Sequence, residues 1–354
     1  MAGLFDPVRM GDLDLANRVV MAPMTRSRAD EEDRPTDIVV DYYRQRAGAG
    51  LIVTEGVQPS AEGKGYARTP GLYNDGQVAA WRRVTDAVHA AGGRIVAQLM
   101  HVGRIAHAAN RQADVPVVAP SAVAAKAKMW TEAGELPTEI PRALGTEEIQ
   151  RVIADYADAA RRAIEAGFDG IELHCTSGYL PAQFMASGTN QRTDGYGGDA
   201  AGRTRFVVET LQAISKTIGA GRTGFRICPG NPFNDLFDED PAETHAVLLR
   251  GLRDLGLAYC HVIAMPTPQK VDQRALVAAE WNGSTILNND LDRDRAAQLL
   301  AEGACDAVSF ARAFIANPDL VERFRRDAAL APFNPKALYG IGAEGYSDYP
   351  PLAD

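Results

Sequence analysis

Short apolar segments alternate with amphipathic segments along most of the chain, from Asn17 almost to the C-terminus. Each apolar segment is rich in Val, Ile and Leu, and a longer segment with helical spacing follows it. This pattern is typical of parallel strands that are buried on both faces. Eight segments are predicted as strands: 18–25, 50–57, 94–101, 169–175, 224–229, 259–264, 285–288 and 306–312. Eight such units without a change of composition predict an α/β fold, a (β/α)8 TIM barrel rather than an open doubly wound sheet.

The segment from 146 to 167 shows how the local signals combine in one of these units. Thr146 is expected to cap a helix, and the two glutamates after it favour the positive end of the helix dipole. Apolar residues then recur at helical spacing from Ile149 to Ile164, and Gly167 is expected to end the helix. The next predicted strand begins two residues later.

Two segments depart from the simple alternation. Residues 4–16 place the turn Gly11-Asp12 between short apolar stretches, so we expect an N-terminal hairpin that plugs the bottom of the barrel. Residues 102–145 contain four prolines and are too long for an ordinary connection between a strand and a helix. They follow the third predicted strand, so they emerge at the end of the barrel where active sites lie. We interpret this insertion as a substrate-shaping lid within a single domain, residues 1–354.

Composition and charge narrow the classes of protein further. The 354 residues are 46% hydrophobic and 23% charged, as in ordinary globular chains, which excludes disorder, coiled coil and collagen. The net charge of −9 argues against a nucleic-acid partner, and no apolar run reaches the roughly 18 residues that span a membrane. The four cysteines form no CxxC pair, and no metal site is expected. We expect a cytoplasmic monomer or homodimer with reduced thiols.

Polar residues at the ends of the predicted strands are the candidates for chemistry. They are Thr25, Gln98, His101, His174, Arg226 and Arg312. Arg312 follows the eighth strand, where barrels of this kind often bind phosphate. His174 and Tyr179 place an imidazole and a phenol at the mouth of one strand. Taken singly, each has an ordinary alternative: a salt bridge at the rim for the arginine, and a structural or packing role for the other two.

Five ordered segments resemble the motifs of the old yellow enzyme family, the FMN-dependent ene-reductases that include alkene reductases of the N-ethylmaleimide reductase type. The segments are 17–26 (NRVVMAPMTR), 98–104 (QLMHVGR), 184–198 (FMASGTNQRTDGYGG), 312–320 (RAFIANPDL) and 345–349 (GYSDY). The likeness spans nearly the whole chain. Five motifs in the family's order are a far more specific signal than any one of them alone.

The resemblance implies an FMN cofactor across the mouth of the barrel. It implies that Thr25 forms a hydrogen bond with the flavin C4 carbonyl and that Gln98 forms hydrogen bonds with the pyrimidine edge of the flavin. It also implies that Arg226 stabilises the negative charge that develops near N1 and O2. Arg312 would hold the phosphate. The full set of cofactor-binding residues implied in this way is Pro23, Met24, Thr25, Gly56, Gln98, Arg226, Asn289, Ala311 and Arg312.

The resemblance also implies an activity, the reduction of activated C=C bonds in α,β-unsaturated carbonyl or nitro compounds by NADH or NADPH. His174 would bond the substrate oxygen, hydride would reach the β-carbon, and Tyr179 would protonate the α-carbon as general acid. Further substrate contacts are expected at Ser177, Met100, Tyr66 and Tyr339. NADH or NADPH and the substrate would occupy the same pocket one after the other, each in its own half-reaction.

Several residues depart from the family's pattern. Ser177 stands where His or Asn is usual, and Met100 where Trp is common. Asn289 and Asp290 replace a frequent Gly pair, and Ala311 replaces a Gly. These departures leave open a second function, a repurposed member that catalyses a non-redox cyclisation or isomerisation, with or without FMN. A binding protein without catalysis is a more distant third, because Tyr179 and Arg226 are retained.

Overall fold

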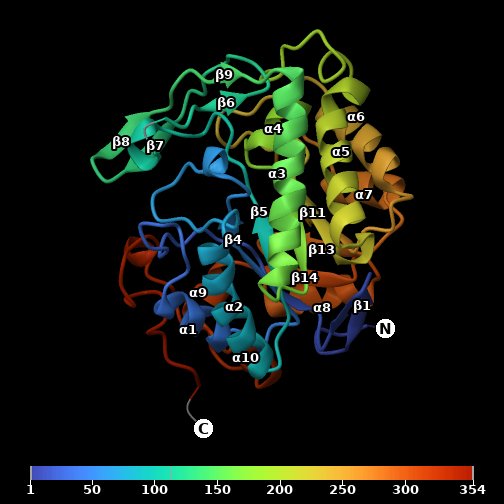
Figure 1. The fold of residues 1–354 in the computed structure, drawn as a ribbon. Helices are drawn as coiled ribbons and strands as arrows, with labels where there is room; N and C mark the ends of the chain where they lie inside the picture. Colours follow the sequence, from blue (N-terminus) through green and yellow to red (C-terminus); the bar gives the residue numbers. More distant parts are fainter. Residues whose placement is uncertain (1, 113, 353–354) are drawn as a thin grey trace.

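Eight parallel strands close into a barrel with helices around it (Figure 1). The computed structural model describes residues 2–112 and 114–352. The barrel strands are β3 (Val19–Met21), β4 (Leu51–Val57), β5 (Ile95–Leu99), β10 (Gly170–His174), β11 (Thr223–Ile227), β12 (Tyr259–Ile263), β13 (Thr285–Asn288) and β14 (Ala307–Phe310). They follow chain order around the barrel, and each overlaps one predicted segment. The predicted (β/α)8 barrel is confirmed.

A helix follows each barrel strand and covers it from outside. In chain order these are α1 (Asp37–Gln45), α2 (Asp75–Ala90), α3 (Thr146–Glu165), α5 (Ala200–Ile218), α6 (Pro241–Leu252), α7 (Gln273–Glu280), α8 (Arg293–Ala301) and α10 (Leu320–Arg325). Two shorter helices, α4 (Leu180–Met185) and α9 (Arg312–Ala316), lie in the connections after β10 and β14. Among the described residues, no helix is both long enough and apolar enough to cross a membrane.

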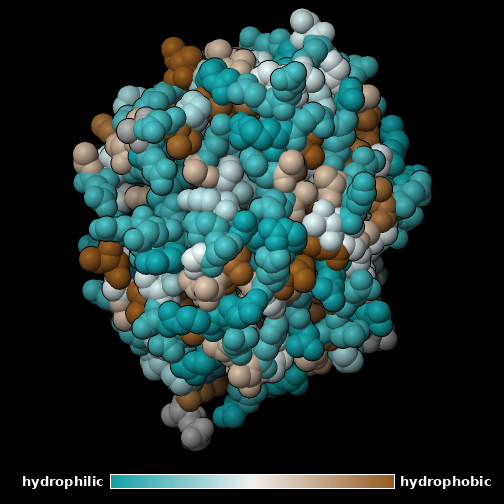
Figure 2. All heavy atoms as spheres, in the orientation of Figure 1, coloured by the Kyte–Doolittle hydropathy of each residue, from teal (hydrophilic) through white to brown (hydrophobic). Residues whose placement is uncertain are grey.

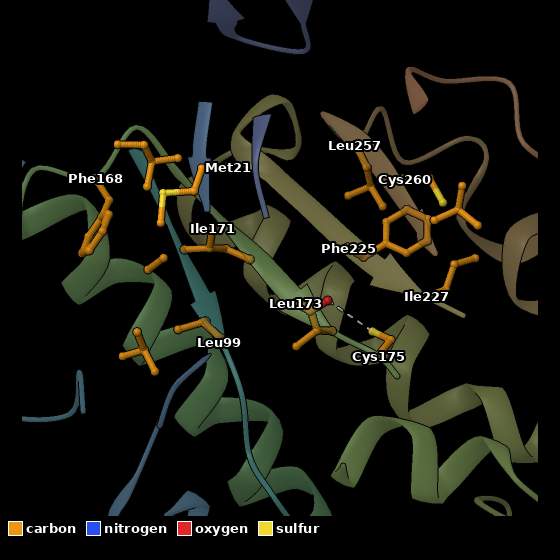
Figure 3. Packing of buried hydrophobic residues seen from close by; sticks show 14 of the residues in the cluster. Met21, Leu99, Phe168, Ile171, Leu173, Cys175, Phe225, Ile227, Leu257 and Cys260 are labelled. Atoms are coloured by element: carbon orange, nitrogen blue, oxygen red, sulfur yellow. Dashed lines mark hydrogen bonds between the residues drawn. The ribbon is translucent and has the colours of Figure 1, made fainter. Parts of the chain in front are cut away.

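Successive side chains along each barrel strand point alternately outward and inward, and they form two hydrophobic cores. Side chains that face outward, such as Met21, Ile171 and Phe225, pack with the apolar faces of the helices (Figure 3). Side chains that face inward, such as Val20 and Val53, form a second cluster inside the barrel. All four cysteines are buried free thiols. The surface in Figure 2 is mainly hydrophilic with scattered apolar residues, as expected for helices whose outer faces meet water.

The helix α3 begins one residue earlier than predicted. Gly145, and not Thr146, is the N-cap, because the Glu148 carboxylate accepts a hydrogen bond from the Gly145 N–H at 2.9 Å and Thr146 is already helical. The predicted end is confirmed. Gly167 has a φ of +87°, and the N–H groups of Gly167 and Phe168 donate back to Ile164 and Ala163 in the manner of a Schellman motif.

The expected N-terminal hairpin is present. It pairs β1 (Val8–Met10) with β2 (Leu13–Leu15) in antiparallel register. Gly11 turns the chain at a φ of +57°, and a Cβ there would lie 2.4 Å from the Gly221 carbonyl oxygen. The apolar side chains of the hairpin pack with the inward-facing side chains of the barrel. In Figure 1 the hairpin lies at the end of the barrel opposite the 102–145 insertion.

The 102–145 insertion contains strands that the sequence did not predict. β6 (Val118–Ala119) pairs in parallel with β9 (Arg142–Ala143). β7 (Lys128–Thr131) and β8 (Gly134–Pro137) form an antiparallel hairpin that stands out from the barrel at the upper left of Figure 1. Strands of two to four residues carry too short an alternation to be distinguished from a loop.

Six of the eight predicted strands extended past the observed C-terminal end, by four residues at β3 and by two at β5, β11 and β14. β3 stops at Met21, so Thr25 lies in the loop beyond it; Pro23 lacks the N–H that a strand ladder needs. β14 stops at Phe310, and Arg312 is the first residue of α9 instead of the last residue of a strand. Both residues still lie at the end of the barrel where the strands finish.

Candidate active site

Three adjacent strands bring buried polar side chains together at the mouth of the barrel. β10 pairs with β5 on one side and with β11 on the other. In this register Glu172 lies opposite Gln98, and His174 lies opposite Arg226. All four side chains are buried. The strand order therefore assembles three predicted site residues, Gln98, His174 and Arg226, with one that was not predicted.

Glu172 is the centre of a buried hydrogen-bond network. It accepts a hydrogen bond from Gln98 Nε2 at 2.8 Å and lies 2.8 Å from His261 Nδ1, while His261 Nε2 lies 2.8 Å from Ser309 Oγ. Burial by itself raises the pKa of Glu172, but His261, Arg226 and Gln98 together hold that pKa below its ordinary value. Burial lowers the pKa of His261, so a neutral His261 donates from Nδ1 to the carboxylate.

Glu172, His261 and Ser309 were not predicted as site residues. Each is a polar residue inside a buried strand, and the segments GIELH and YCHVI show the first two plainly. A polar residue at an inward-facing position of a barrel strand is the signal that could have found them, because such a group must find a partner inside.

Arg226 carries a buried donor that is free for a ligand. Its Nη2 donates to Asn288 Oδ1 at 2.9 Å, but its Nε has no hydrogen-bond partner among the described residues. Burial lowers the pKa of this guanidinium, and the charge of Glu172 opposes the decrease. A guanidinium remains a cation in proteins. A fixed cation with an unpaired N–H fits the electron-rich edge of a bound flavin.

His174 is neutral and presents a donor. Burial, and then the nearby charge of Arg226, lower the pKa of His174 to about 3. Its Nδ1 lies 3.3 Å from Gln98 Nε2. Because the amide nitrogen donates, Nδ1 accepts, and the imidazole proton is on Nε2. That N–H is available for a substrate oxygen.

Tyr179 is a protonated phenol beside this donor. Its ring centroid lies 5.2 Å from that of His174, and its hydroxyl lies 2.9 Å from the Tyr66 hydroxyl. Burial raises the pKa of Tyr179 well above its ordinary value, and the neighbouring phenol of Tyr66 adds to the increase. The phenol therefore keeps its proton over the whole physiological range.

A left-handed turn connects the two residues. Ser177 and Gly178 have φ values of +60° and +75°, and a Cβ on Gly178 would lie 2.7 Å from Asn234 Cβ. Asn234, also at a φ of +60°, donates from Nδ2 to the Ser177 carbonyl oxygen at 2.8 Å. Its hydrogen bonding opposes the pKa increase of Tyr179. Asn234 was not predicted, although Asn-Asp after a strand is a common turn signal.

Apolar residues of the insertion pack beside Tyr179. Met100 and Tyr179 form a cluster with Val102, Ile105, Ala106, Val117, Ala125 and Met129, and Tyr66 packs against it. A Cβ on Gly56 would lie 2.6 Å from Met100 Sδ, so the absence of a side chain on β4 makes room for the methionine. The structure thus brings Gly56, Met100, Tyr66 and Tyr179 together.

The remaining predicted residues lie in the C-terminal segment and in the loop after β3. Tyr339, in the C-terminal segment, is 59% exposed, and its phenol contributes to the raised pKa of both Tyr66 and Tyr179. Pro23, Met24 and Thr25 are half-buried in the loop after β3. His101 is buried, and its Nε2 lies 3.8 Å from Glu62 Oε1.

A cavity of about 390 Å³ lies at the ends of β12, β13 and β14. It brings the predicted phosphate-binding residues Asn289, Ala311 and Arg312 together with Asp290. Arg312 Nη2 donates to Asp290 Oδ1 at 2.6 Å, and Asn289 Oδ1 accepts from the Asp290 N–H at 2.7 Å. One N–H group of the Arg312 guanidinium and the backbone N–H of Asp290 therefore have partners within the chain.

Comparisons with known proteins agree with this arrangement. A profile of the NADH:flavin oxidoreductase / NADH oxidase family matches residues 3–330. A probable flavin mononucleotide-dependent alkene reductase of Leishmania infantum is 39% identical over 355 residues, which cover 98% of this chain and 97% of that protein.

Solved structures match equally well. Morphinone reductase in complex with tetrahydroNAD has a TM-score of 0.95 and 42% identity, with 100% of this chain and 99% of that chain covered. The old yellow enzyme homologue from Zymomonas mobilis has a TM-score of 0.96 and 38% identity, with 99% and 100% covered. The chain therefore belongs to the NADH:flavin oxidoreductase / NADH oxidase family, as one of the old yellow enzymes, which are flavin-dependent oxidoreductases.

Proposed function

We propose that this protein is an FMN-dependent ene-reductase that uses NADH or NADPH to reduce activated C=C bonds of α,β-unsaturated carbonyl or nitro compounds. The observation that carries the proposal is the pairing of a neutral His174 donor with a protonated Tyr179 at one mouth, next to the unpaired N–H of Arg226. The names of the relatives support it, since one is an alkene reductase and another binds a reduced nicotinamide analogue.

The residues around the barrel mouth suit FMN, which supplies hydride transfer when it is bound. Arg226 would bind the pyrimidine edge through its free Nε, with Gln98 beside it. Thr25, together with Pro23, Met24 and Gly56, would line the ring system. Arg312, with Asn289 and Ala311, would hold the phosphate at the cavity that lies at the ends of β12, β13 and β14.

The chain's own groups then account for substrate activation. His174 Nε2–H binds the substrate carbonyl or nitro oxygen and stabilises the negative charge that develops there as hydride adds to the β-carbon. Tyr179 transfers its hydroxyl proton to the α-carbon, which completes the saturated product. The Tyr66 hydroxyl at 2.9 Å stabilises the phenolate that remains. Ser177, Met100 and Tyr339 would complete the walls of the substrate pocket.

Residues 1–354 would form one domain of a cytoplasmic enzyme, and its partner would be a small-molecule substrate. The 102–145 insertion would act as the lid, since its apolar residues pack directly on Met100 and Tyr179 and keep water from the reacting carbons. A non-redox cyclisation or isomerisation remains the second candidate. The reductase function is favoured, because the relatives are reductases and both acid–base groups are in place.

The half-reactions of Tyr179→Phe test the proposal. Only substrate reduction needs a proton on carbon, so reoxidation of reduced enzyme by a cyclic enone should slow by about 10²–10⁴-fold, while flavin reduction by NADPH changes little. Stopped-flow absorbance of the flavin measures both steps. Tyr66→Phe is the matched control: it removes the other hydroxyl of the pair and should slow reoxidation far less. Equal slowing of both half-reactions, or a protein that binds no flavin, would contradict the proposal.

A further inference from the structure

The cavity at the ends of β12, β13 and β14 contains an internal substitute for a phosphate. Asp290 Oδ1 lies 2.6 Å from Arg312 Nη2, so a carboxylate occupies the position on the guanidinium where a phosphate oxygen would bind. The Asp290 N–H is bonded to Asn289 Oδ1. The two residues that stand in place of a Gly pair of the family thus engage one N–H of the guanidinium and one backbone N–H at this cavity.

We propose that Asn289 and Asp290 form an internal cap on the phosphate subsite, so that this enzyme discriminates only weakly between FMN and flavins without a phosphate, such as riboflavin. The inference rests on the proposed function, because it takes Arg312 as the phosphate ligand. The specificity-determining residue is Asp290, and Asn289 supports it.

The local sequence explains why the cap forms. Asn289 and Asp290 follow directly on the last residue of β13, at the turn that precedes α8. Short polar side chains at such turns bond to neighbouring backbone groups. A glycine at either position has no side chain with which to do this, and would leave the amide and the guanidinium free.

The charges of Arg312, Asp290 and the phosphate decide how much the cap weakens FMN binding. The side chains of Arg312 and Asp290 are 65% and 88% exposed, and such ion pairs contribute little stability. The cap can therefore open when a phosphate arrives. A phosphate carries close to two negative charges, and the carboxylate repels it whether or not the ion pair is intact. The charges of Arg312 and Asp290 cancel, so the subsite has no net attraction for an anion.

Dissociation constants of the flavin-free full-length protein test the cap. Quenching of flavin fluorescence gives the Kd for FMN and for riboflavin. We expect the wild-type values to differ less than tenfold. In Asp290→Asn the Kd for FMN should decrease about tenfold, as expected for removing one charge a few ångströms from a phosphate at a surface, with less than twofold change for riboflavin. Asn289→Gly combined with Asp290→Gly should strengthen FMN binding further.

The dependence of the FMN dissociation constant on salt concentration is a second test of the cap. Added NaCl should weaken FMN binding by Asp290→Asn more than by the wild type, because only the variant has a net attraction to be screened. Asp294→Asn is the matched control. Asp294 lies on α8 at 86% exposure and pairs with Arg293, so its removal should change neither Kd.

The outcomes separate the cap from the proposed function. If Arg312→Ala weakens FMN binding but Asp290→Asn does not strengthen it, the cap is wrong and the phosphate role of Arg312 stands. If Arg312→Ala changes FMN binding neither in the wild type nor in Asp290→Asn, the phosphate binds elsewhere. Both assignments at this cavity are then wrong. A wild-type preference for FMN above a hundredfold would also overturn the cap, and absence of flavin binding would contradict the reductase as well.

Discussion

In the substrate pocket, burial and a neighbouring cation decide the protonation state of His174. A pKa of about 3 lies below the ordinary value of 6.5, so the imidazole is neutral in the folded protein at every pH above about 5. The pKa of Tyr179 is raised, so the phenol is protonated over the same range. In the proposed mechanism, substrate binding by His174 and proton transfer from Tyr179 therefore need no titration between pH 5 and 8.

We expect the ratio of the reoxidation rates of wild type and His174→Asn to stay constant from pH 5 to pH 8. The ratio removes the pH dependence that belongs to the flavin and to the substrate. Stopped-flow measurement with a cyclic enone at intervals of half a pH unit provides it. An inflection of the ratio near pH 6.5 would show that His174 titrates in the folded protein, contrary to its buried position.

Ser177 is a strained residue as well as a short one. Its φ of +60° is a conformation that Asn adopts more readily than Ser. We expect Ser177→Asn to increase the reoxidation rate with a small cyclic enone several-fold, because the amide both suits the backbone and reaches the developing oxyanion. FMN content should not change. Ser177→Ala should cost little, whereas His174→Ala should nearly abolish the reaction.

Ser177→Gly separates the two effects in Ser177→Asn. Glycine relieves the backbone strain without adding a donor, so it should raise stability but not the reoxidation rate. Equal rates for Ser177→Gly and Ser177→Asn would assign the gain to the backbone. A large loss in Ser177→Ala would show that the serine hydroxyl has a role of its own, for a substrate other than a simple enone.

At the scale of elements, one guanidinium joins the 102–145 insertion to the loop after β11. Arg104, at 1% exposure, donates through Nη1 to the Val123 and Ala124 carbonyls and through Nη2 to the Asp235 carbonyl at 2.6 Å. The Asp235 carboxylate lies no closer than 3.9 Å. Arg104 therefore works mainly through carbonyl groups, and it holds the insertion over the turn that contains Asn234.

We expect Arg104→Gln to loosen the insertion, because a shorter side chain leaves several of these carbonyls unpaired. Limited proteolysis should cut residues 102–145 faster, and the reoxidation rate should decrease while the Kd for FMN does not change. Arg142→Gln is the control, since Arg142 forms an exposed pair with Glu148. Unchanged proteolysis in Arg104→Gln would mean that the apolar cluster alone holds the insertion.

At the scale of the whole molecule, a buried carboxyl connects the N-terminal strands to the C-terminal segment. Glu55 on β4 accepts from the backbone N–H of Arg26 at 3.1 Å. The Arg26 side chain donates to the Leu338 and Gly345 carbonyls. Burial raises the pKa of Glu55 to about 7, against the opposing effect of these donors.

The raised pKa makes stability depend on pH. The folded state binds a proton at Glu55 up to about pH 7, whereas the unfolded state releases it near 4.5. The contribution is therefore fully present below pH 4.5 and is lost as pH rises to 7. Between pH 4.5 and 8, we expect wild type to lose up to about 3 kcal/mol of unfolding free energy relative to Glu55→Gln, from roughly 1.4 kcal/mol per pKa unit.

Urea denaturation of both proteins at pH 4.5, 6 and 8 measures this difference. Asp41→Asn, at an exposed carboxyl paired with Arg44, is the control and should track the wild type. Parallel stability curves for wild type and Glu55→Gln would mean that Glu55 is ionised in the folded protein at every pH tested.

Much of the fold could be read from the sequence because the signals are local. Buried strands such as Val19–Met21 are continuous apolar runs, and α3 has a helical period with a glycine at its end. The strands of the insertion could not be read, because two to four residues do not define a period. The ends of β3 and β14 were placed too late, since a strand ends where its neighbour stops pairing.

The sequence by itself determined the barrel and the cofactor family, and it pointed to some of the groups at the mouth, such as His174 and Arg226, because motifs and periodicity are properties of the chain. Only the tertiary structure decided how those groups act. Strand register placed Glu172 beside Gln98, burial and Arg226 made His174 neutral, and two left-handed turns brought Asn234 to Ser177. Whether Asp290 points to solvent or binds Arg312 depends on the distance between two loops. Distances, burial and charge pairing arise between segments far apart in the chain, and no local pattern encodes them.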